Sequence, residues 1–181
     1  MKAWKTLARE TVLHFSRFLT VESHTIELPD GRIVPDWPWV IIPDYVNVIP
    51  VTPQKEFLCF RQTKYAADGV TLAPAGGMID PGETPLMAAE RELREEMGLA
   101  AGEFVFLGSF ANDGNRGVGI GHLYLALDAV PVAKTQSDDL EEQELIRLSR
   151  AQFRTALLAG EFKIMSWSAS AALVLVYLAD E

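Results

Sequence analysis

The stretch from Gly77 to Leu99, GMIDPGETPLMAAERELREEMGL, carries the pattern that decides how this chain is interpreted. Glu92, Glu95 and Glu96 are spaced i, i+3 and i+4, so an α-helix would place all three carboxylates on one face. Like charges at this spacing repel each other by roughly 0.2–0.5 kcal/mol per pair. A bound divalent cation would remove that conflict and turn the cluster into a metal site.

The residues around the acidic cluster predict that it lies on a helix. Thr84 is a suitable N-cap, and Pro85 suits the first helical position, where its missing N–H group costs nothing. Gly98 is a natural residue for the turn that ends a helix. The predicted helix also carries an apolar stripe that would face a core, formed by Leu86, Ala89, Leu93 and Met97.

A glycine-rich loop, Pro74-Ala75-Gly76-Gly77, precedes this helix and can bring backbone atoms close to a ligand or an ion. Arg91 lies four residues before Glu95 and can pair with it, which holds one acid in place while others bind metal. The alternative interpretation is a solvated acidic helix face, which is what most runs of charge are. That alternative explains neither the glycine loop nor the glycine that ends the helix.

The composition is that of one ordinary globular domain. The chain has 181 residues, of which 49% are hydrophobic and 23% charged, enough to bury a sizeable core. The net charge of −9 argues against a broad nucleic-acid or membrane-surface footprint, so we expect neither partner. It does not argue against an anionic substrate, because bound cations reverse the local sign of an acidic site.

We expect a cytoplasmic protein. A single cysteine, Cys59, excludes an intramolecular disulfide and is typical of a reducing compartment. The first ten residues, MKAWKTLARE, lack the continuous apolar run of a secretory signal peptide. The longest weakly polar run, from Trp167 to Ala179, is too short to span a bilayer and is typical of a core helix.

Periodicity predicts the order of elements in the first part of the chain. Residues 3–18 have the apolar spacing of a helix. Residues 19–34 alternate around Pro29-Asp30-Gly31, which predicts a β-hairpin, and residues 35–39 form a stiff aromatic connector. Residues 40–51 and 56–62 are predicted core strands joined by a turn at 52–55, and residues 65–71 a loop.

The second part contributes strands over residues 104–110 and 121–127, around a polar, glycine-rich loop at 112–119. An acidic segment at 138–144 follows. Ser149 is the expected N-cap of a helix over 150–159, and a final helix is predicted over 168–178. Strands on both sides of one helix, with more helix at the end, give an α+β or an α/β three-layer arrangement. This pattern leaves the topology open.

The spacing between Gly77 and Leu99 resembles the Nudix box at every defining position. Gly77 is followed after five residues by Glu83 and after seven more by Arg91-Glu92-Leu93, and Gly98 closes the motif after Glu95-Glu96. Fixed gaps of this kind are far more specific than a lone glycine pattern. The resemblance implies an α+β fold, an α/β/α sandwich with a mixed β-sheet between helices. Gly77, Glu83 and Gly98 would be structural positions of the box.

The family resemblance also implies a division of the chain. Residues 40–181 would form the Nudix hydrolase domain. Residues 1–39 would be an extension, made of the predicted helix and β-hairpin, that contributes to dimerisation.

Nudix enzymes hydrolyse a nucleoside diphosphate linked to another group, and the charge of the diphosphate repels an attacking water. Mg²⁺ or Mn²⁺ would neutralise that charge and lower the pKa of a bound water. Glu92 and Glu96, one turn apart, are the best candidate ligands, and Glu95 is the next. The resemblance implies that the carbonyl oxygen of Ala75 adds a further ligand.

The attacking water also needs a base. In the ADP-ribose pyrophosphatase branch of the family, the base resembles a glutamate on a later loop, which corresponds here to residues 138–144. The Glu-x-x-Glu-aliphatic pattern of that branch falls on Glu141 and Glu144. We favour Glu141, with Glu142 and Glu144 as alternatives, while a solvated acidic loop is the other interpretation. Alternatively, the Nudix box itself supplies the base. In that case Glu95 is the candidate, and Arg91 is the catalytic residue that pairs with it.

Further features resemble the same branch, which acts on ADP-ribose and nucleoside diphosphate sugars. They are the hairpin around Pro29-Asp30-Gly31, the pair Arg61-Gln62 at the end of a strand, and the Pro74-Ala75-Gly76 entry to the box. Two positions depart from the branch: Leu72 stands where a glutamate is common, and residues 114–116 lack a proline. These departures weaken the assignment to ADP-ribose itself.

Four residues are candidates for substrate binding. Trp37 and Trp39 could stack a purine, although packing of the hairpin is the alternative. Arg61 and Arg116 could contact phosphate, although a structural ion pair and an unliganded surface position are the alternatives. The branch is implied to form a homodimer in which the N-terminal segment reaches the partner's site.

The sequence therefore predicts a metal-dependent enzyme that hydrolyses the diphosphate bond of a nucleoside diphosphate sugar, ADP-ribose or a relative. The products would be a nucleoside monophosphate and a sugar phosphate. One alternative is an enzyme that removes modified nucleoside triphosphates, although such an enzyme needs no N-terminal extension. Another is a non-catalytic sensor of ADP-ribose-like ligands, although a sensor is expected to lose acids from the box.

Overall fold

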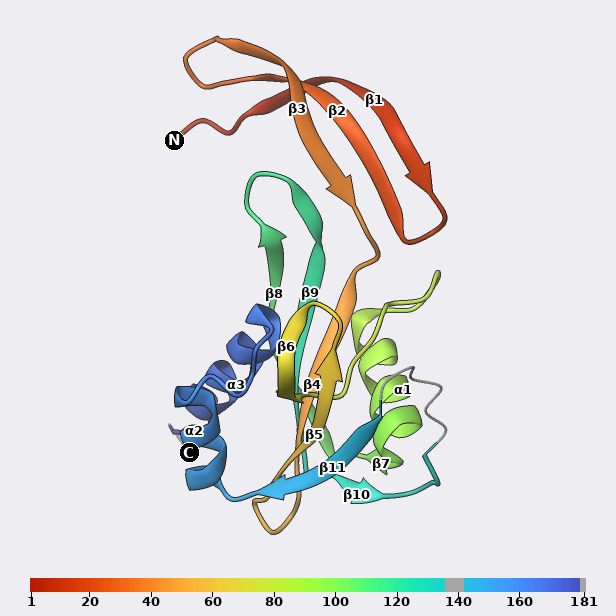
Figure 1. The fold of residues 1–181 in the computed structure, drawn as a ribbon, viewed down its shortest axis with the longest axis vertical. Helices are drawn as coiled ribbons and strands as arrows, with labels where there is room; N and C mark the ends of the chain where they lie inside the picture. The colour runs from red at the N-terminus through yellow and green to blue at the C-terminus, as the bar shows by residue number, and fades with distance from the viewer. Residues whose placement is uncertain (136–141, 180–181) are drawn as a thin grey trace. The chain divides into compact units, whose positions relative to one another are not determined.

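The computed structural model describes residues 1–135 and 142–179 (Figure 1). The chain divides into two compact units. Unit 1 contains Met1–Asp44 and Phe110–Ile120, and unit 2 contains Tyr45–Ser109 and Gly121–Glu181.

Unit 1 is built on three antiparallel strands: β1 (Lys5–Phe15), β2 (Leu19–Glu27) and β3 (Ile33–Ile41). The turn between β2 and β3 lies at the predicted Pro-Asp-Gly sequence, where the Gly31 N–H donates to the Leu28 carbonyl at 2.9 Å. The predicted hairpin is thus confirmed. The predicted connector over 35–39 is wrong, since these residues are the middle of β3.

The helix predicted over residues 3–18 is also wrong, because most of this segment is the strand β1. Its pairing with β2 shifts register between Thr6 and Ala8 and again between Thr11 and Leu13. A β-bulge inserts one extra residue, so the apolar side chains no longer alternate with a strict period of two. Two bulges in one strand imitate helical spacing, and only the pairing with β2 shows the difference.

Unit 2 contains the mixed sheet that the family resemblance implied. Strand β4 (Tyr45–Val51) runs parallel to β9 (Gly117–Leu127), from Tyr45 opposite Gly121 to Val51 opposite Leu127. Strand β8 (Glu103–Asp113) pairs with β9. Strand β5 (Phe57–Lys64) carries β11 (Gln143–Leu148) and β6 (Ala67–Ala73) as antiparallel neighbours. A separate small pair joins β7 (Leu99–Ala100) to β10 (Val130–Pro131).

Several predicted boundaries in this region change. The turn at 52–55 is confirmed by the hydrogen bond from Lys55 N–H to the Thr52 carbonyl at 2.9 Å. The predicted loop at 65–71 is wrong, because β6 occupies most of it. Residues 112–119 form the end of a β-hairpin rather than a long loop, since β8 and β9 extend to Asp113 and from Gly117.

Among the described residues of unit 2, three helices cover the sheet: α1 (Pro85–Met97), α2 (Arg150–Leu158) and α3 (Met165–Tyr177). Leu58 and Phe60 of β5 share a core with Leu93 and Met97 of α1. Phe57 and Cys59 pack in a second core with residues of α2 and α3. Because side chains alternate along a strand, α1 lies on one face of the sheet and α2 and α3 on the other (Figure 1). The α/β/α sandwich is confirmed.

None of the helices within the described residues is both long enough and apolar enough to cross a membrane.

Candidate functional site

The helix α1 begins and ends where the sequence predicts. The Thr84 side chain accepts a hydrogen bond from the Met87 N–H at 3.2 Å, and Pro85 is the first helical residue. Gly98 ends the helix with a left-handed φ of 66°, which glycine adopts without strain. Leu86 is the one member of the predicted stripe that is exposed, while Ala88 is buried in addition to Ala89, Leu93 and Met97. The caps and the buried residues therefore fix the ends and the orientation of the helix that carries the acids.

Arg91 is the centre of a carboxylate network on this helix. Its Nε and Nη2 atoms donate to both oxygens of Glu83, at 2.8 and 2.9 Å. Its Nη1 donates to Glu92 Oε1 at 2.7 Å and lies 3.4 Å from Glu95 Oε2. Nη2 also donates to the Met78 carbonyl at 3.0 Å, which ties the loop before the helix to the same guanidinium. The predicted pairing with Glu95 exists, but the two-pronged bond to Glu83 has better geometry.

This network shifts the acidity of its members. The Arg91 guanidinium, by its hydrogen bonds, and secondarily the Asp80 N–H lower the pKa of Glu83 from 4.5 to about 2. The same bonds to Glu83 raise the pKa of Arg91 above its ordinary value. Glu83 is therefore an anion throughout the physiological range, and its structural position in the box has a direct physical reason.

The glycine loop fits closely against the other two acids. An added Cβ at Gly77 would lie 2.2 Å from Glu92 Oε1, so only glycine leaves room for this carboxylate. The Gly76 N–H donates to Glu96 Oε2 at 2.8 Å. Glu92 is 9% exposed and Glu96 partly buried. The sequence and the fold thus bring the loop and both predicted ligands together.

The donor set suits a hard divalent cation, because Glu92 and Glu96 supply carboxylate oxygens from one helix face beside a loop of backbone groups. The carbonyl of Ala75 accepts a hydrogen bond from the Val48 N–H at 2.8 Å, which uses one of its two lone pairs. Glu95 is more exposed than the other two acids. Within residues 1–135 and 142–179, no three Asp, Glu, His or Cys side chains are already gathered into a group that could hold a metal ion, so Glu95 would have to move to join Glu92 and Glu96 as a third acidic ligand.

The base candidates are described only in part. Glu141 lies outside the described residues. Glu142 is exposed. Glu144 lies in β11 opposite Arg61 of β5, and the two side chains form an ion pair at 3.2 Å. This pair is the structural interpretation of Arg61 that the sequence left open.

Arg61 also lines a cavity of about 360 Å³ together with Ala151 and Thr155 of α2. Cys59 lies two residues before Arg61 on β5, so the two side chains point to the same face of the sheet, and Cys59 packs with residues of α2 and α3. The structure therefore places Arg61 on the α2 face of the sheet, opposite to the face that packs against α1.

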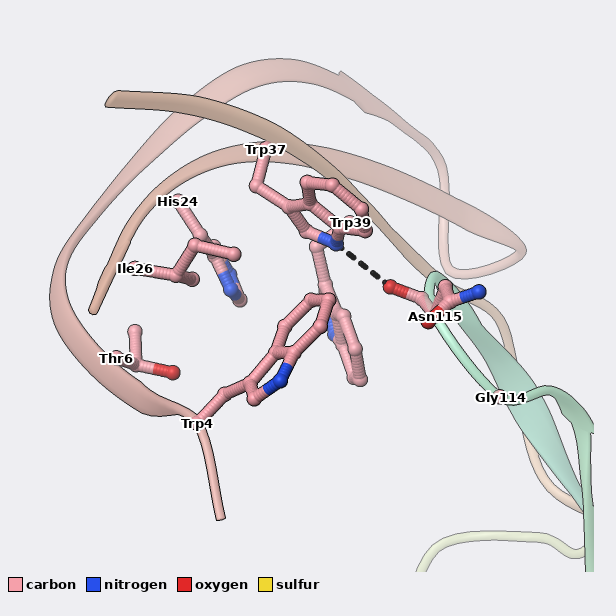
Figure 2. Close-up of a pocket in the computed structure, with 8 residues that line it drawn as sticks. All are labelled: Trp4, Thr6, His24, Ile26, Trp37, Trp39, Gly114 and Asn115. Atoms are coloured by element: carbon pink, nitrogen blue, oxygen red, sulfur yellow. Dashed lines mark hydrogen bonds between the residues drawn. The ribbon is translucent and has the colours of Figure 1, made fainter. Parts of the chain in front are cut away.

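The other substrate candidates belong to unit 1. Trp37 and Trp39 of β3 line a cavity of about 380 Å³, with Trp4, Thr6, His24, Ile26 and the turn at 114–115 (Figure 2). Trp37 donates its indole N–H to the Asn115 carbonyl at 2.7 Å. The side chain of Arg116 is about half exposed, and its Nη1 lies 3.4 Å from Asp113 Oδ2. The sequence did not single out Trp4 or His24 as lining residues of this cavity. Trp4 lies in the segment predicted to be a helix, and the neighbours of His24 are set by strand register, which the sequence alone does not give.

Comparison with known protein families assigns both parts of the chain. Residues 42–167 match the family described as NUDIX domain, which covers more than half of the chain. The chain belongs to the Nudix family. Residues 4–40 match the family described as nucleoside diphosphate sugar hydrolase N-terminal domain.

Individual relatives agree with this assignment. The chain is 32% identical over 109 residues to ADP compounds hydrolase NudE of Escherichia coli (strain K12), which covers 57% of this chain and 58% of that protein. It is 24% identical over 153 residues to ADP-ribose pyrophosphatase of Bacillus subtilis (strain 168), covering 84% and 80%. The matches to the first two curated relatives span about half of their length. A crystal structure of an ADP compounds hydrolase has the same fold, with a TM-score of 0.81, 24% identity, and coverage of 99% and 96%.

Proposed function

We propose that this chain is a divalent-metal-dependent hydrolase that cleaves the diphosphate bond of a nucleoside diphosphate sugar, ADP-ribose or a relative. The products are a nucleoside monophosphate and a sugar phosphate. The observation that carries the proposal is the arrangement of Glu92 and Glu96 against the glycine loop, with Arg91 bound to Glu83 and Glu92. The two family matches and the names of the relatives support the choice of substrate class.

In this mechanism Glu92 and Glu96 would hold Mg²⁺ or Mn²⁺, with Glu95 and the Ala75 carbonyl as further ligands. Such a cation would supply positive charge that neutralises the diphosphate and makes the attacking water more acidic. The oxygen of the water bonds to one phosphorus as the bridging P–O bond breaks, and the leaving phosphate keeps that oxygen. A glutamate takes the proton of the water. We favour Glu141 for this role, with Glu142, Glu144 and the box residue Glu95 as alternatives.

Arg91 positions the acids rather than reacting, since its donors are used by Glu83, Glu92 and the Met78 carbonyl. Trp37 and Trp39 are proposed to bind the base. Arg116 is proposed for phosphate binding. Arg61 has the same proposed role, although its ion pair with Glu144 must open for it and its side chain lies on the α2 face of the sheet, opposite to α1.

We further propose that residues 1–39 form an extension to a hydrolase domain at 40–181 and make the contact of a homodimer. The support is the exposure of β1 along its whole length. A cytoplasmic location with no nucleic-acid or membrane partner remains part of the proposal, on the grounds of charge and cysteine content.

The decisive test replaces one ligand and keeps the helix. Glu96→Gln retains the shape and the bond from the Gly76 N–H but removes the charge. We expect kcat to fall by at least about 100-fold with unchanged circular dichroism, because loss of a metal ligand removes several kcal/mol of charge stabilisation. Glu90→Gln is the matched control, since Glu90 is an exposed glutamate on the same helix.

The assay measures release of phosphate monoesters from ADP-ribose, ADP-glucose, GDP-mannose, NADH, diadenosine polyphosphates and nucleoside triphosphates, with and without Mg²⁺. Preference for a diphosphate sugar that chelation abolishes supports the proposal. Activity on triphosphates alone assigns the chain to the removal of modified nucleotides instead. If no compound of the panel is hydrolysed but the chain binds ADP-ribose, a non-catalytic sensor is favoured.

A further inference from the structure

A serine and a histidine are hydrogen-bonded across two neighbouring strands of unit 2 (Figure 1). Ser109 of β8 and His122 of β9 both belong to this unit, and Ser109 Oγ lies 2.7 Å from His122 Nδ1. The pair is exposed, and neither residue has a part in the mechanism proposed above. Because Nδ1 is engaged by the serine, the second ring nitrogen, Nε2, is left for another partner.

The pairing depends on a glycine that breaks the alternation of side chains along β8. Leu107 packs in the core shared with α2 and α3, and strict alternation would point Ser109 to the same face. Gly108 between them has a φ of 137°, which glycine adopts easily and other residues rarely adopt. Ser109 is thus turned to the face of His122. Local breaks of this kind re-aim side chains and are frequent beside active sites.

His122 lies on the face of the sheet that carries α1. It is opposite Val46 in the parallel pairing of β4 with β9, and residues that are directly opposite each other share a face. Val46 packs in one core with Leu93 of α1, and Tyr124, two residues after His122, packs in the same core. The imidazole therefore lies on the same side of the sheet as the catalytic helix.

The glycine loop lies on the other side of Val46 at the same level. The Val46 N–H donates to the Gly77 carbonyl at 2.9 Å, and Glu92 lies against Gly77. Neighbouring strands are about 4.8 Å apart, so the backbone of His122 lies roughly 10 Å across the sheet from that of Gly77. A diphosphate with its attached sugar, bound beside Glu92, is long enough to reach the imidazole.

The acids of α1 leave an anionic substrate in need of hydrogen-bond donors. Arg91 already uses its donors on Glu83, Glu92 and the Met78 carbonyl. The oxygens of an ionised phosphate only accept hydrogen bonds, so each needs an N–H or O–H group opposite. An imidazole whose Nδ1 accepts from a serine hydroxyl carries its proton on Nε2 and is such a donor.

We infer that His122 is a substrate-binding residue of the hydrolase: with Nδ1 held by the Ser109 hydroxyl, its Nε2–H donates to an oxygen of the diphosphate. This inference rests on the proposed function, because the diphosphate is that of the proposed substrate. Ser109 is a positioning residue, since it acts through the imidazole by fixing its orientation and its tautomer.

Two amide substitutions separate the roles of the two ring nitrogens. The amide of asparagine falls near the Nδ1 position of histidine, and the amide of glutamine falls near the Nε2 position. His122→Asn therefore keeps a partner for Ser109 and loses the outer donor, while His122→Gln keeps the outer donor. The test measures binding by isothermal calorimetry with Mg²⁺. The probe is the α,β-methylene analogue of ADP-ribose, or of whichever diphosphate sugar the hydrolysis panel favours, so that cleavage of the bridging bond plays no part.

We expect His122→Asn to weaken binding of the analogue by about 10- to 100-fold, and His122→Gln to restore most of the affinity. Ser109→Ala should weaken binding by about 3- to 10-fold, because the imidazole remains but is no longer held. His14→Asn is the matched control, since His14 Nδ1 makes a similar bond to the Thr20 hydroxyl at 2.9 Å in unit 1. This variant should bind the analogue as the natural chain does.

Full affinity in His122→Asn with a loss in His122→Gln would show that the histidine only pairs with Ser109. Equal affinity in all variants would show that it makes no contact with the substrate. Either result overturns the inference and leaves the hydrolase proposal intact, as does a natural chain that hydrolyses the diphosphate sugar but does not bind its analogue. If His122→Asn does not fold by circular dichroism, His122→Gln decides: retained affinity supports the inference, and a loss as large as that expected for His122→Asn rejects it. Binding that depends on Nε2, without hydrolysis of any diphosphate, rejects the hydrolase proposal alone.

Discussion

At the scale of single residues, Arg91 explains why the acids of α1 can stand so close together. Its guanidinium contacts Glu83, Glu92 and Glu95, so each of these three carboxylates lies beside a positive charge. A planar fork with several donors is required for this, and a lysine could not make the two-pronged bond to Glu83. Helical spacing predicts the Glu95 contact. Glu83 lies before the helix, so only the resemblance to the box pointed to it.

The low pKa of Glu83 makes a prediction about stability. The folded pKa of about 2 lies below the ordinary 4.5, so the charged pair with Arg91 stabilises the fold fully above pH 4.5. This contribution is lost as the pH falls from 4.5 towards 2. Glu83→Gln should therefore lower the free energy of unfolding by roughly 1 kcal/mol at pH 7 and by almost nothing near pH 2.

Urea unfolding of both proteins between pH 2 and pH 7 checks this expectation, with Glu90→Gln as the control on the same helix. A difference between Glu83→Gln and the natural chain that stays constant over the whole range would show that the ion pair is not its cause.

At the scale of elements, the loop and the helix act as one unit because glycine at position 77 leaves the space that Glu92 occupies. The capping by Thr84 and Gly98 is local, so the sequence predicted α1 to within the residue. The strand β1 shows the opposite case. Its backbone partners lie up to 22 positions away, at Glu27 opposite Lys5, and its bulges imitate a helical period.

Gly77→Ala is predicted to damage the site more than the fold. The new methyl group would lie 2.2 Å from Glu92 Oε1, so the carboxylate must move away from its bond to Arg91. We expect kcat/KM to fall by about 10- to 100-fold, the usual cost of disturbing a ligand's support. Hydrolysis and thermal unfolding are measured together.

Gly102→Ala is the control, because the nearest atom to its added Cβ is the Cβ of Asp128 at an ordinary 3.5 Å. A Gly77→Ala enzyme with normal kcat/KM would mean that the position of Glu92 is not needed.

At the scale of the whole molecule, the exposed apolar residues of unit 1 bear on assembly. Val12 and Phe15 of β1 are 66% and 69% exposed, and Ile33 of β3 is 61% exposed. Among the described strands, β1 pairs only with β2, so one of its edges carries no strand. Open edges and contiguous apolar patches are features that proteins cover. These observations support the proposed homodimer.

We predict that sedimentation equilibrium at micromolar concentration gives twice the mass of one chain. Val12→Asp combined with Phe15→Asp should give a monomer, because each new charge would be buried in the contact. Val70→Asp is the control, since Val70 is 55% exposed on β6 in unit 2 and should leave the dimer unchanged. A monomeric natural chain would remove both the dimer and the idea that the N-terminal segment serves a partner's site.

The sequence by itself determined the helix α1 with its caps, the Nudix assignment, and the pairing of Glu92 and Glu96 with a glycine loop. All of these depend on residues within about 25 positions of one another, where spacing alone specifies geometry. Only the tertiary structure decided that β1 is a strand, that Arg61 pairs with Glu144, and that Trp4 joins Trp37 and His24 around one cavity. The physical reason is strand register: pairing across the sheet, including where bulges shift it, sets which distant side chains share a face.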